Sequence, residues 1–80
     1  MKIEIIAFGI AKEIFEGDKI TVELNDGATI ADLKSRLEDK YNDLKTLSSY
    51  MIAMDSEYAS NGMKIIQGKE IAIIPPVSGG

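Results

Sequence analysis

Residue types able to do chemistry are few in this 80-residue chain. Cysteine and histidine are both absent, which excludes Cys-His and Ser-His nucleophiles, disulfides and thiolate zinc sites. Asp55 and Glu57 provide two carboxylates, where a hard cation takes about six oxygen ligands. The other carboxylates lie among lysines on expected helix faces and turns, where solvated surface explains them. The side chains therefore predict no metal site and no active site of the chain's own.

The last segment has more specific chemistry. It reads Pro75-Pro76-Val77-Ser78-Gly79-Gly80. A terminal glycine carboxylate is unhindered at its α-carbon, and Gly79-Gly80 lets the backbone enter a channel too narrow for a Cβ. The two prolines hold the exit extended, and six residues reach about 20 Å. Such a tail can carry its last atom into another protein's active site. An inert, frayed terminus is the alternative that these residues alone leave open.

Composition and charge narrow the class of protein. The chain has 9 Lys and Arg against 13 Asp and Glu, a formal net charge of −4. It contains no basic cluster of the kind that binds nucleic acid or an anionic membrane surface. The apolar start is short and is interrupted by Glu4, so it is neither a signal peptide nor a membrane span. We expect a single cytoplasmic domain.

The elements that must position the tail begin with strands. Strands are predicted at residues 2–8, 20–24, 51–54, 57–59 and 70–74, where apolar residues alternate or run continuously. The second face of the first strand becomes apolar at Ile6 and Phe8. Asp55-Ser56 separates the third predicted strand from the fourth, with which it can form a hairpin. Pro75 ends the last strand, because proline cannot donate to a β-ladder.

Helices are predicted between these strands. The longest begins at Thr29, whose hydroxyl can cap the first-turn N–H groups, with Asp32 completing a short capping box. Apolar residues recur at helical spacing along it: Ile30, Leu33, Leu37 and Tyr41. A short helix is predicted after Gly9, with Gly17 as the C′ residue that ends it. No helix or strand is predicted for residues 41–50.

This order of elements predicts an α+β fold, the ubiquitin-like β-grasp roll. It has a mixed sheet, one main helix packed on one face and a flexible C-terminal tail. The helical crossover allows the last strand to lie parallel to the first. We expect the β-grasp domain to span residues 1–74 and the extended Gly-Gly tail to span residues 75–80.

Residues 70–80, which follow a turn at Gly68, resemble the closing strand and tail of the small, sulfur-carrier subunit of molybdopterin synthase, the MoaD-like proteins. Residues 7–8 and 11–14 resemble the first strand and short helix of that family, and residues 27–33 resemble its turn and helix start. The resemblance therefore covers nearly the whole chain, and the tail is its most specific part.

The resemblance implies a function carried out in partner proteins. An E1-like adenylyltransferase would use ATP to adenylate the carboxylate of Gly80, and a sulfur donor would convert it to a thiocarboxylate. The large subunit of molybdopterin synthase, in a heterotetramer of two small and two large subunits, would pass the sulfur to cyclic pyranopterin monophosphate. This chain itself would bind no cofactor.

The family pattern also implies roles for residues before Gly80. Pro75, Pro76, Val77, Ser78 and Gly79 would thread the tail into the partner's site. Ile74 and Tyr58 would dock the partners on the outer face of the sheet. An ordinary core position is the alternative for Ile74, and an isolated exposed tyrosine is the alternative for Tyr58.

Three other functions remain open from the residues. One is a sulfur carrier for thiamine synthesis, tRNA thiolation or cysteine synthesis, with the same terminal chemistry. Another is a ubiquitin-like modifier conjugated to lysines through Gly80, and the third is a binding module with an inert tail. Pro75-Pro76-Val77 favours the molybdopterin pathway.

Overall fold

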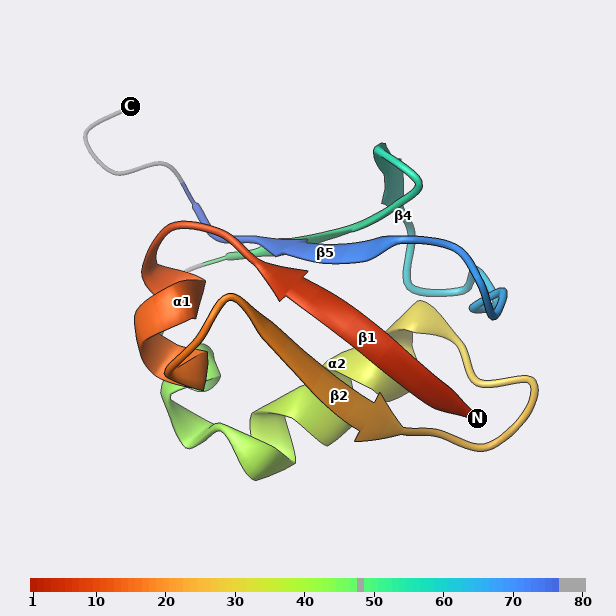
Figure 1. The fold of residues 1–80 in the computed structure, drawn as a ribbon, viewed down its shortest axis with the longest axis horizontal. Helices are drawn as coiled ribbons and strands as arrows, with labels where there is room; N and C mark the ends of the chain where they lie inside the picture. Colours follow the sequence, from red (N-terminus) through yellow and green to blue (C-terminus); the bar gives the residue numbers. More distant parts are fainter. Residues whose placement is uncertain (48, 77–80) are drawn as a thin grey trace.

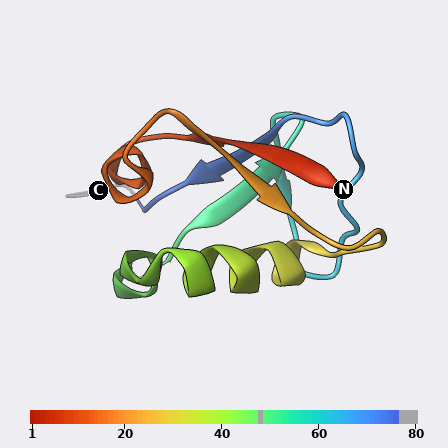
Figure 2. The same cartoon turned by 60° about the horizontal axis from the view of Figure 1, so that its bottom comes forward.

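The computed structural model describes residues 1–47 and 49–76. Across these residues one mixed sheet is covered on one face by a helix (Figures 1 and 2). The strands are β1 (Lys2–Ala7), β2 (Lys19–Glu23), β3 (Met51–Met54), β4 (Glu57–Ala59) and β5 (Ile71–Ile74). The helices are α1 (Ile10–Phe15), α2 (Ile30–Lys40) and the 3₁₀ helix η1 (Asn42–Thr46). The predicted β-grasp roll is confirmed.

The sheet has the strand order β2-β1-β5-β3-β4. β1 and β5 run parallel, with Ile5 opposite Ile71 and Ala7 opposite Ile73, whereas the other neighbours are antiparallel. A parallel pair cannot be closed by a tight turn and needs a crossover, which the segment containing α2 supplies. The expected parallel pairing of the first and last strands is therefore confirmed. It places the end of β5, where the tail begins, in the middle of the sheet.

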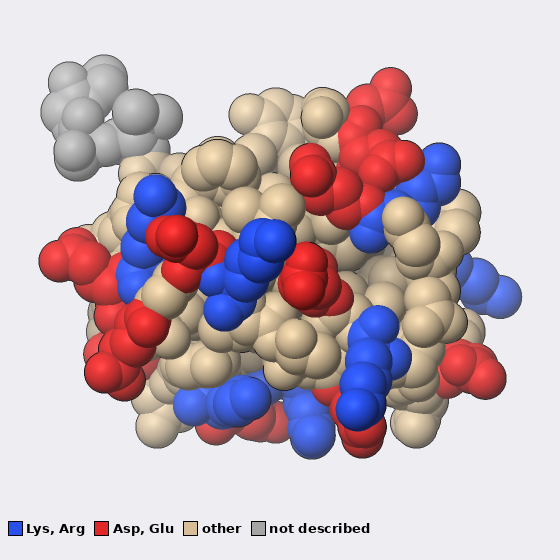
Figure 3. Space-filling model, viewed as in Figure 1, with Lys and Arg blue, Asp and Glu red and all other residues tan. Residues whose placement is uncertain are grey.

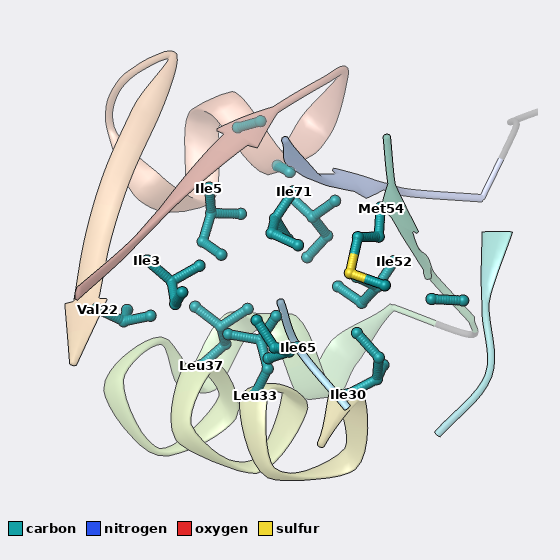
Figure 4. Close-up of a cluster of buried hydrophobic side chains, with 14 of the residues drawn as sticks. Ile3, Ile5, Val22, Ile30, Leu33, Leu37, Ile52, Met54, Ile65 and Ile71 are labelled. Atoms are coloured by element: carbon teal, nitrogen blue, oxygen red, sulfur yellow. The ribbon is translucent and has the colours of Figure 1, made fainter. Parts of the chain in front are cut away.

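The core lies between the inner face of the sheet and α2 (Figure 4). Ile3 and Ile5 of β1 point toward Leu33 and Leu37 of α2. Ile5, Leu33 and Leu37 have no exposed surface. The period of two in the strands and of 3.6 in the helix brings these residues to one layer. The described residues include no buried polar or charged side chain.

α2 begins with the predicted capping box. The Asp32 N–H donates to Thr29 Oγ1 at 3.3 Å, and the Thr29 N–H donates to Asp32 Oδ2 at 2.9 Å. Two N–H groups without helical partners are satisfied in this way, and the acidic side chain also lies at the positive end of the helix dipole. No helix in the described residues is long and apolar enough to cross a membrane.

The end of α1 differs from the prediction. Glu16, not Gly17, holds the left-handed position, with φ 60°. The Gly17 N–H donates to the Lys12 carbonyl at 3.0 Å, so Gly17 is the residue after C′ in a Schellman motif. The left-handed backbone of Glu16 ends the helix one residue earlier than expected, directly after Phe15, which is buried in the core.

The segment 41–50, for which no element was predicted, contains η1. Leu44 of this 3₁₀ helix is fully buried, and the ring of Tyr41 packs at a tilt against that of Phe15, with ring centroids 4.7 Å apart. Tyr50 donates a hydrogen bond to Glu38 of α2. Burial, together with this hydrogen bond, raises the pKa of the Tyr50 phenol. These contacts close the end of the core and give the segment a structural role.

Candidate functional site: an outer-face groove at the start of the tail

The outer face of the sheet, opposite α2, carries its own apolar row. The strand registers align Tyr58 of β4, Ala53 of β3, Ala72 of β5 and Ile6 of β1 across four strands. Successive side chains of a strand point to opposite faces of the sheet, and the buried neighbours of these residues along each strand point to the core. This row therefore faces away from α2. β3 and β5 are therefore apolar on both faces, although α2 covers only one of them.

A groove runs along this face beside the point where the tail begins. It is lined by Phe8, Ala53, Ser56, Tyr58, Glu70, Ala72 and Ile74. Tyr58 is 66% exposed and Phe8 is 48% exposed, whereas Ala53 and Ala72 are almost completely buried. The short alanine side chains thus form a floor between larger neighbours. We call these seven residues the outer groove.

Met51 extends the apolar surface beside the outer groove. It lies opposite Ile74 in the β3–β5 register and is 45% exposed. Covering apolar surface releases about 25 cal/mol per Å². A contiguous exposed apolar patch on a small domain is typical of an interaction site. The outer groove is therefore the surface best suited to dock another protein.

A polar clamp holds one end of the outer groove. Asp55 and Ser56 both have positive φ, 51° and 69°, which gives a two-residue turn of the kind favoured in β-hairpins. Asp55 Oδ1 accepts the Glu70 N–H at 2.8 Å, and Asp55 Oδ2 lies 3.1 Å from Lys69 Nζ. The Glu70 N–H and the Lys69 ammonium lower the pKa of the Asp55 carboxyl. The clamp ties the β3–β4 hairpin, which carries Tyr58, to the start of β5.

Charge elsewhere on the surface is mixed. Figure 3 shows Lys and Arg interspersed with Asp and Glu across one face, and uncharged side chains along much of its upper edge. The ion pairs Lys12–Asp18 and Lys19–Glu4 are largely exposed, which limits each to a small contribution. In the described part of the chain, no group of three or more His, Cys, Asp or Glu residues could hold a metal ion.

The structure brings two of the predicted site residues together. Ile74 and Tyr58 line the same groove, although the strands that carry them are not adjacent in the sheet. Pro75 and Pro76 follow β5 directly and are half-buried. Val77, Ser78, Gly79 and Gly80 lie outside the described residues. A docking role for Ile74 and Tyr58, and a threading role for the tail, stay predictions.

Phe8, Ala53, Ala72 and Met51 were missed as site residues. The available signal was the apolar content of both faces in residues 51–54 and 70–74, which exceeds what one covering helix can bury. Phe8 had a weaker signal, as an aromatic residue just beyond the last inward-facing residue of β1.

The comparisons with known proteins agree with one another. The sequence model of the ThiS family matches residues 5–80 of this chain. A molybdopterin synthase sulfur carrier subunit from Dictyostelium discoideum is 38% identical over 81 residues, covering 96% of this chain and 94% of the relative. A protein of the same name from Chlamydomonas reinhardtii is 32% identical over 83 residues and is covered completely, as is this chain.

Solved structures share the fold. A putative molybdopterin converting factor subunit 1 from Pyrococcus furiosus has a TM-score of 0.86 at 21% identity, covering 96% of this chain and 99% of its own. SAMP1 from Haloferax volcanii has a TM-score of 0.84 at 24% identity over all of both chains. A chain in the complex of subunits 1 and 2 of molybdopterin-converting factor from Helicobacter pylori has a TM-score of 0.67 at 25% identity, again over all of both chains.

Proposed function

The chain belongs to the ThiS family, and on that premise we propose that it is the sulfur carrier subunit of a molybdopterin synthase. The observation that carries the proposal is the outer groove, an apolar docking surface that adjoins the first residues of a Gly-Gly tail. The curated relatives named as such subunits, alike over nearly their whole length, support it. The chain has no thiol, so its sulfur would be carried on a backbone carboxyl group.

Loading would take place in the site of an E1-like adenylyltransferase. A carboxylate oxygen of Gly80 attacks the α-phosphorus of ATP, and pyrophosphate leaves. Hydrosulfide supplied by a donor then attacks the carbonyl carbon of the acyl-adenylate, and AMP leaves with the original oxygen. The product is a thiocarboxylate, formed without any change in redox state. The absence of a β-carbon at Gly79 and Gly80 suits entry of the tail into an enclosed site.

Unloading would take place in the large subunit, the partner expected from the Helicobacter pylori complex of subunits 1 and 2. The thiocarboxylate sulfur forms a bond to an oxygen-bearing carbon of cyclic pyranopterin monophosphate and becomes a thioester, while the carbon–oxygen bond breaks and the oxygen leaves as water or with the phosphate. Water then cleaves the acyl–sulfur bond, which leaves sulfur on the pterin and restores the Gly80 carboxylate. A dithiolene holds two sulfur atoms, so each product consumes two loaded carriers. This stoichiometry suits a heterotetramer with two small subunits.

The outer groove would serve both partners. Each must hold the carrier while its tail is extended, and the groove is the apolar surface nearest the tail's origin. Residues that transfer protons or bind the pterin would belong to the partners, because no cluster in the described residues offers such chemistry.

The test is intact-mass measurement after incubation with an E1-like enzyme, ATP and a sulfide donor. We expect a mass increase equal to the exchange of one oxygen for one sulfur, absent in the variant that lacks Gly80. The loaded protein, mixed with the large subunit and cyclic pyranopterin monophosphate, should return to its starting mass as molybdopterin forms. A loaded carrier that transfers no sulfur there would refute the molybdopterin assignment. A lysine conjugate through Gly80 would instead identify a modifier.

A further inference from the structure

We infer that Gly9 is a positioning residue for sulfur transfer. Because Gly9 has no side chain, the Pro75 ring can pack against it, and this contact sets the direction in which the tail leaves the sheet. The inference rests on the proposed function and extends it to a residue outside the outer groove. In this role Gly9 acts through Pro75 and does not itself contact the reacting atoms.

The backbone of Gly9 requires glycine. Gly9 has φ 55° and ψ −134°, a conformation that L-residues avoid because their Cβ collides with neighbouring backbone atoms. It lies between the end of β1 and the first residue of α1, where the chain turns sharply out of the sheet. The Lys12 N–H donates to its carbonyl at 3.1 Å, which fixes that turn to the first turn of α1.

The second constraint is a contact with the tail. A Cβ placed on Gly9 would lie 3.1 Å from Pro75 Cγ and 4.0 Å from Pro75 Cδ. The two residues meet because β1 and β5 are parallel. The last register pair is Ala7 with Ile73, and Gly9 and Pro75 each lie two residues beyond it. The Pro75 ring therefore rests on the side of Gly9 that a side chain would fill.

This contact acts at the base of the tail. A Cβ at Gly9 would force the Pro75 ring to shift by a few tenths of an ångström, and the chain beyond it would leave the sheet in a different direction. For an extended tail of about 20 Å, a turn of about 10° at its base moves the last atom by about 3–4 Å. Displacements of about 1 Å between reacting groups can already slow a reaction about a hundredfold. The outer groove would still dock the partner.

The experiment compares two glycine-to-alanine variants. Both strain the backbone, but only one also brings a Cβ against Pro75. Gly9→Ala introduces both the backbone strain and the tight contact with Pro75. Gly27→Ala is the matched control, because Gly27 also has positive φ, 84°, but nothing lies within 4 Å of its Cβ position. The measurements are melting temperature, affinity for the large subunit, and the single-turnover rate of sulfur transfer at saturating large subunit.

Both variants should melt at lower temperature, by roughly 5–15 °C. Gly9→Ala should bind the large subunit within about twofold of wild type and transfer sulfur at least tenfold more slowly, whereas Gly27→Ala should transfer at the wild-type rate. A wild-type transfer rate for Gly9→Ala would overturn the inference. An equal loss of affinity and rate would also overturn it. Wild-type protein that cannot be loaded or unloaded would instead refute the proposed function.

The proline variants keep the inference testable if Gly9→Ala does not fold. Pro75→Ala and Pro76→Ala each remove one proline from the tail, but only Pro75 touches the Gly9 position. Pro75→Ala should slow transfer more than Pro76→Ala, and adding Gly9→Ala to it should have little further effect, as expected for residues that act through one contact. Equal losses for the two proline variants would show that tail stiffness alone is responsible and would overturn the inference.

Discussion

The two faces of the sheet are both apolar but differ in side-chain size and in exposure. The inner face carries Ile5, Ile52, Ile71 and Ile73, all without exposed surface beneath α2. The outer face carries alanines between large, exposed residues and has no covering element in the described part of the chain. Interlocking large side chains fill the inner layer, whereas the outer layer leaves a groove.

This difference separates stability from recognition within a single sheet. Closing the inner face removes most of the apolar area that a domain of this size can bury, so stability depends on it. Leaving the outer face open keeps apolar area that only a partner would cover. Changes on the inner face should therefore act on folding, and changes on the outer face should act on binding.

Leu33→Ala should have the largest effect, on the inner face. Leu33 is fully buried between α2 and the sheet, so truncation should lower the free energy of unfolding by about 2–5 kcal/mol. Urea denaturation measures this loss. Affinity for the large subunit should be unchanged at temperatures where the variant is folded.

Ser35→Ala is the control for this change, since Ser35 is an exposed residue of the same helix. Its effect should be within about 0.5 kcal/mol of zero. Equal stability of the two variants would mean that α2 does not present Leu33 to the core.

Ile74→Lys should have the next largest effect, on the outer face. Ile74 lines the outer groove directly before the tail and is only half-buried. A lysine there should weaken binding to the large subunit by about 2–4 kcal/mol, while the melting temperature changes little. Titration calorimetry measures the affinity.

Ile66→Lys makes the same chemical change at an isoleucine that is 53% exposed and lies outside the outer groove. It should leave the affinity unchanged. Similar losses at both positions would indicate a general effect of charge and would remove Ile74 from the docking surface.

Sequence patterns were sufficient to predict the inner face and not the outer groove. Helical spacing of Leu33 and Leu37, the Thr29 cap and strand alternation are local signals, and each holds in the structure. The floor formed by Ala53 and Ala72 depends on pairings between strands distant in sequence. An alanine in a strand looks the same whether neighbours bury it or leave it open.

The contact between Gly9 and Pro75 is unpredictable for the same reason. Glycine at the end of a strand is an ordinary turn signal, and proline at the start of a tail is an ordinary strand terminator. Only the parallel pairing of β1 with β5 brings the two together. Gly17 illustrates a different error, because a local signal there predicted the right kind of helix end one residue too late.

Tyr58→Ala should weaken binding less than Ile74→Lys does. Tyr58 stands 66% exposed at the wall of the outer groove, opposite Ala53. Removing its ring should reduce the affinity for the large subunit about five- to tenfold, with a small change in stability. Tyr58→Phe keeps the ring and should restore most of the affinity. If the phenylalanine variant binds as weakly as the alanine variant, the hydroxyl and not the apolar ring is responsible.

Asp55→Asn should have the smallest effect, because it alters the clamp behind the outer groove and neither face directly. Hydrogen bonding from the Glu70 N–H, and then the Lys69 ammonium, hold the pKa of Asp55 below its ordinary value of 3.8. A carboxyl group with a lowered pKa stabilises the fold above its ordinary pKa, and this contribution disappears as the pH falls through the folded-state value.

Asparagine is neutral at every pH but can still accept the Glu70 N–H. The stability difference between wild type and Asp55→Asn should therefore be constant near neutral pH and shrink as the pH falls below about 4. Thermal melting across that range measures it. Affinity for the large subunit at neutral pH should fall threefold or less, since Tyr58 keeps its place in β4 through the pairing with β3. A difference that persisted undiminished in acid would show that hydrogen-bond geometry, and not the charge of Asp55, holds the hairpin to β5.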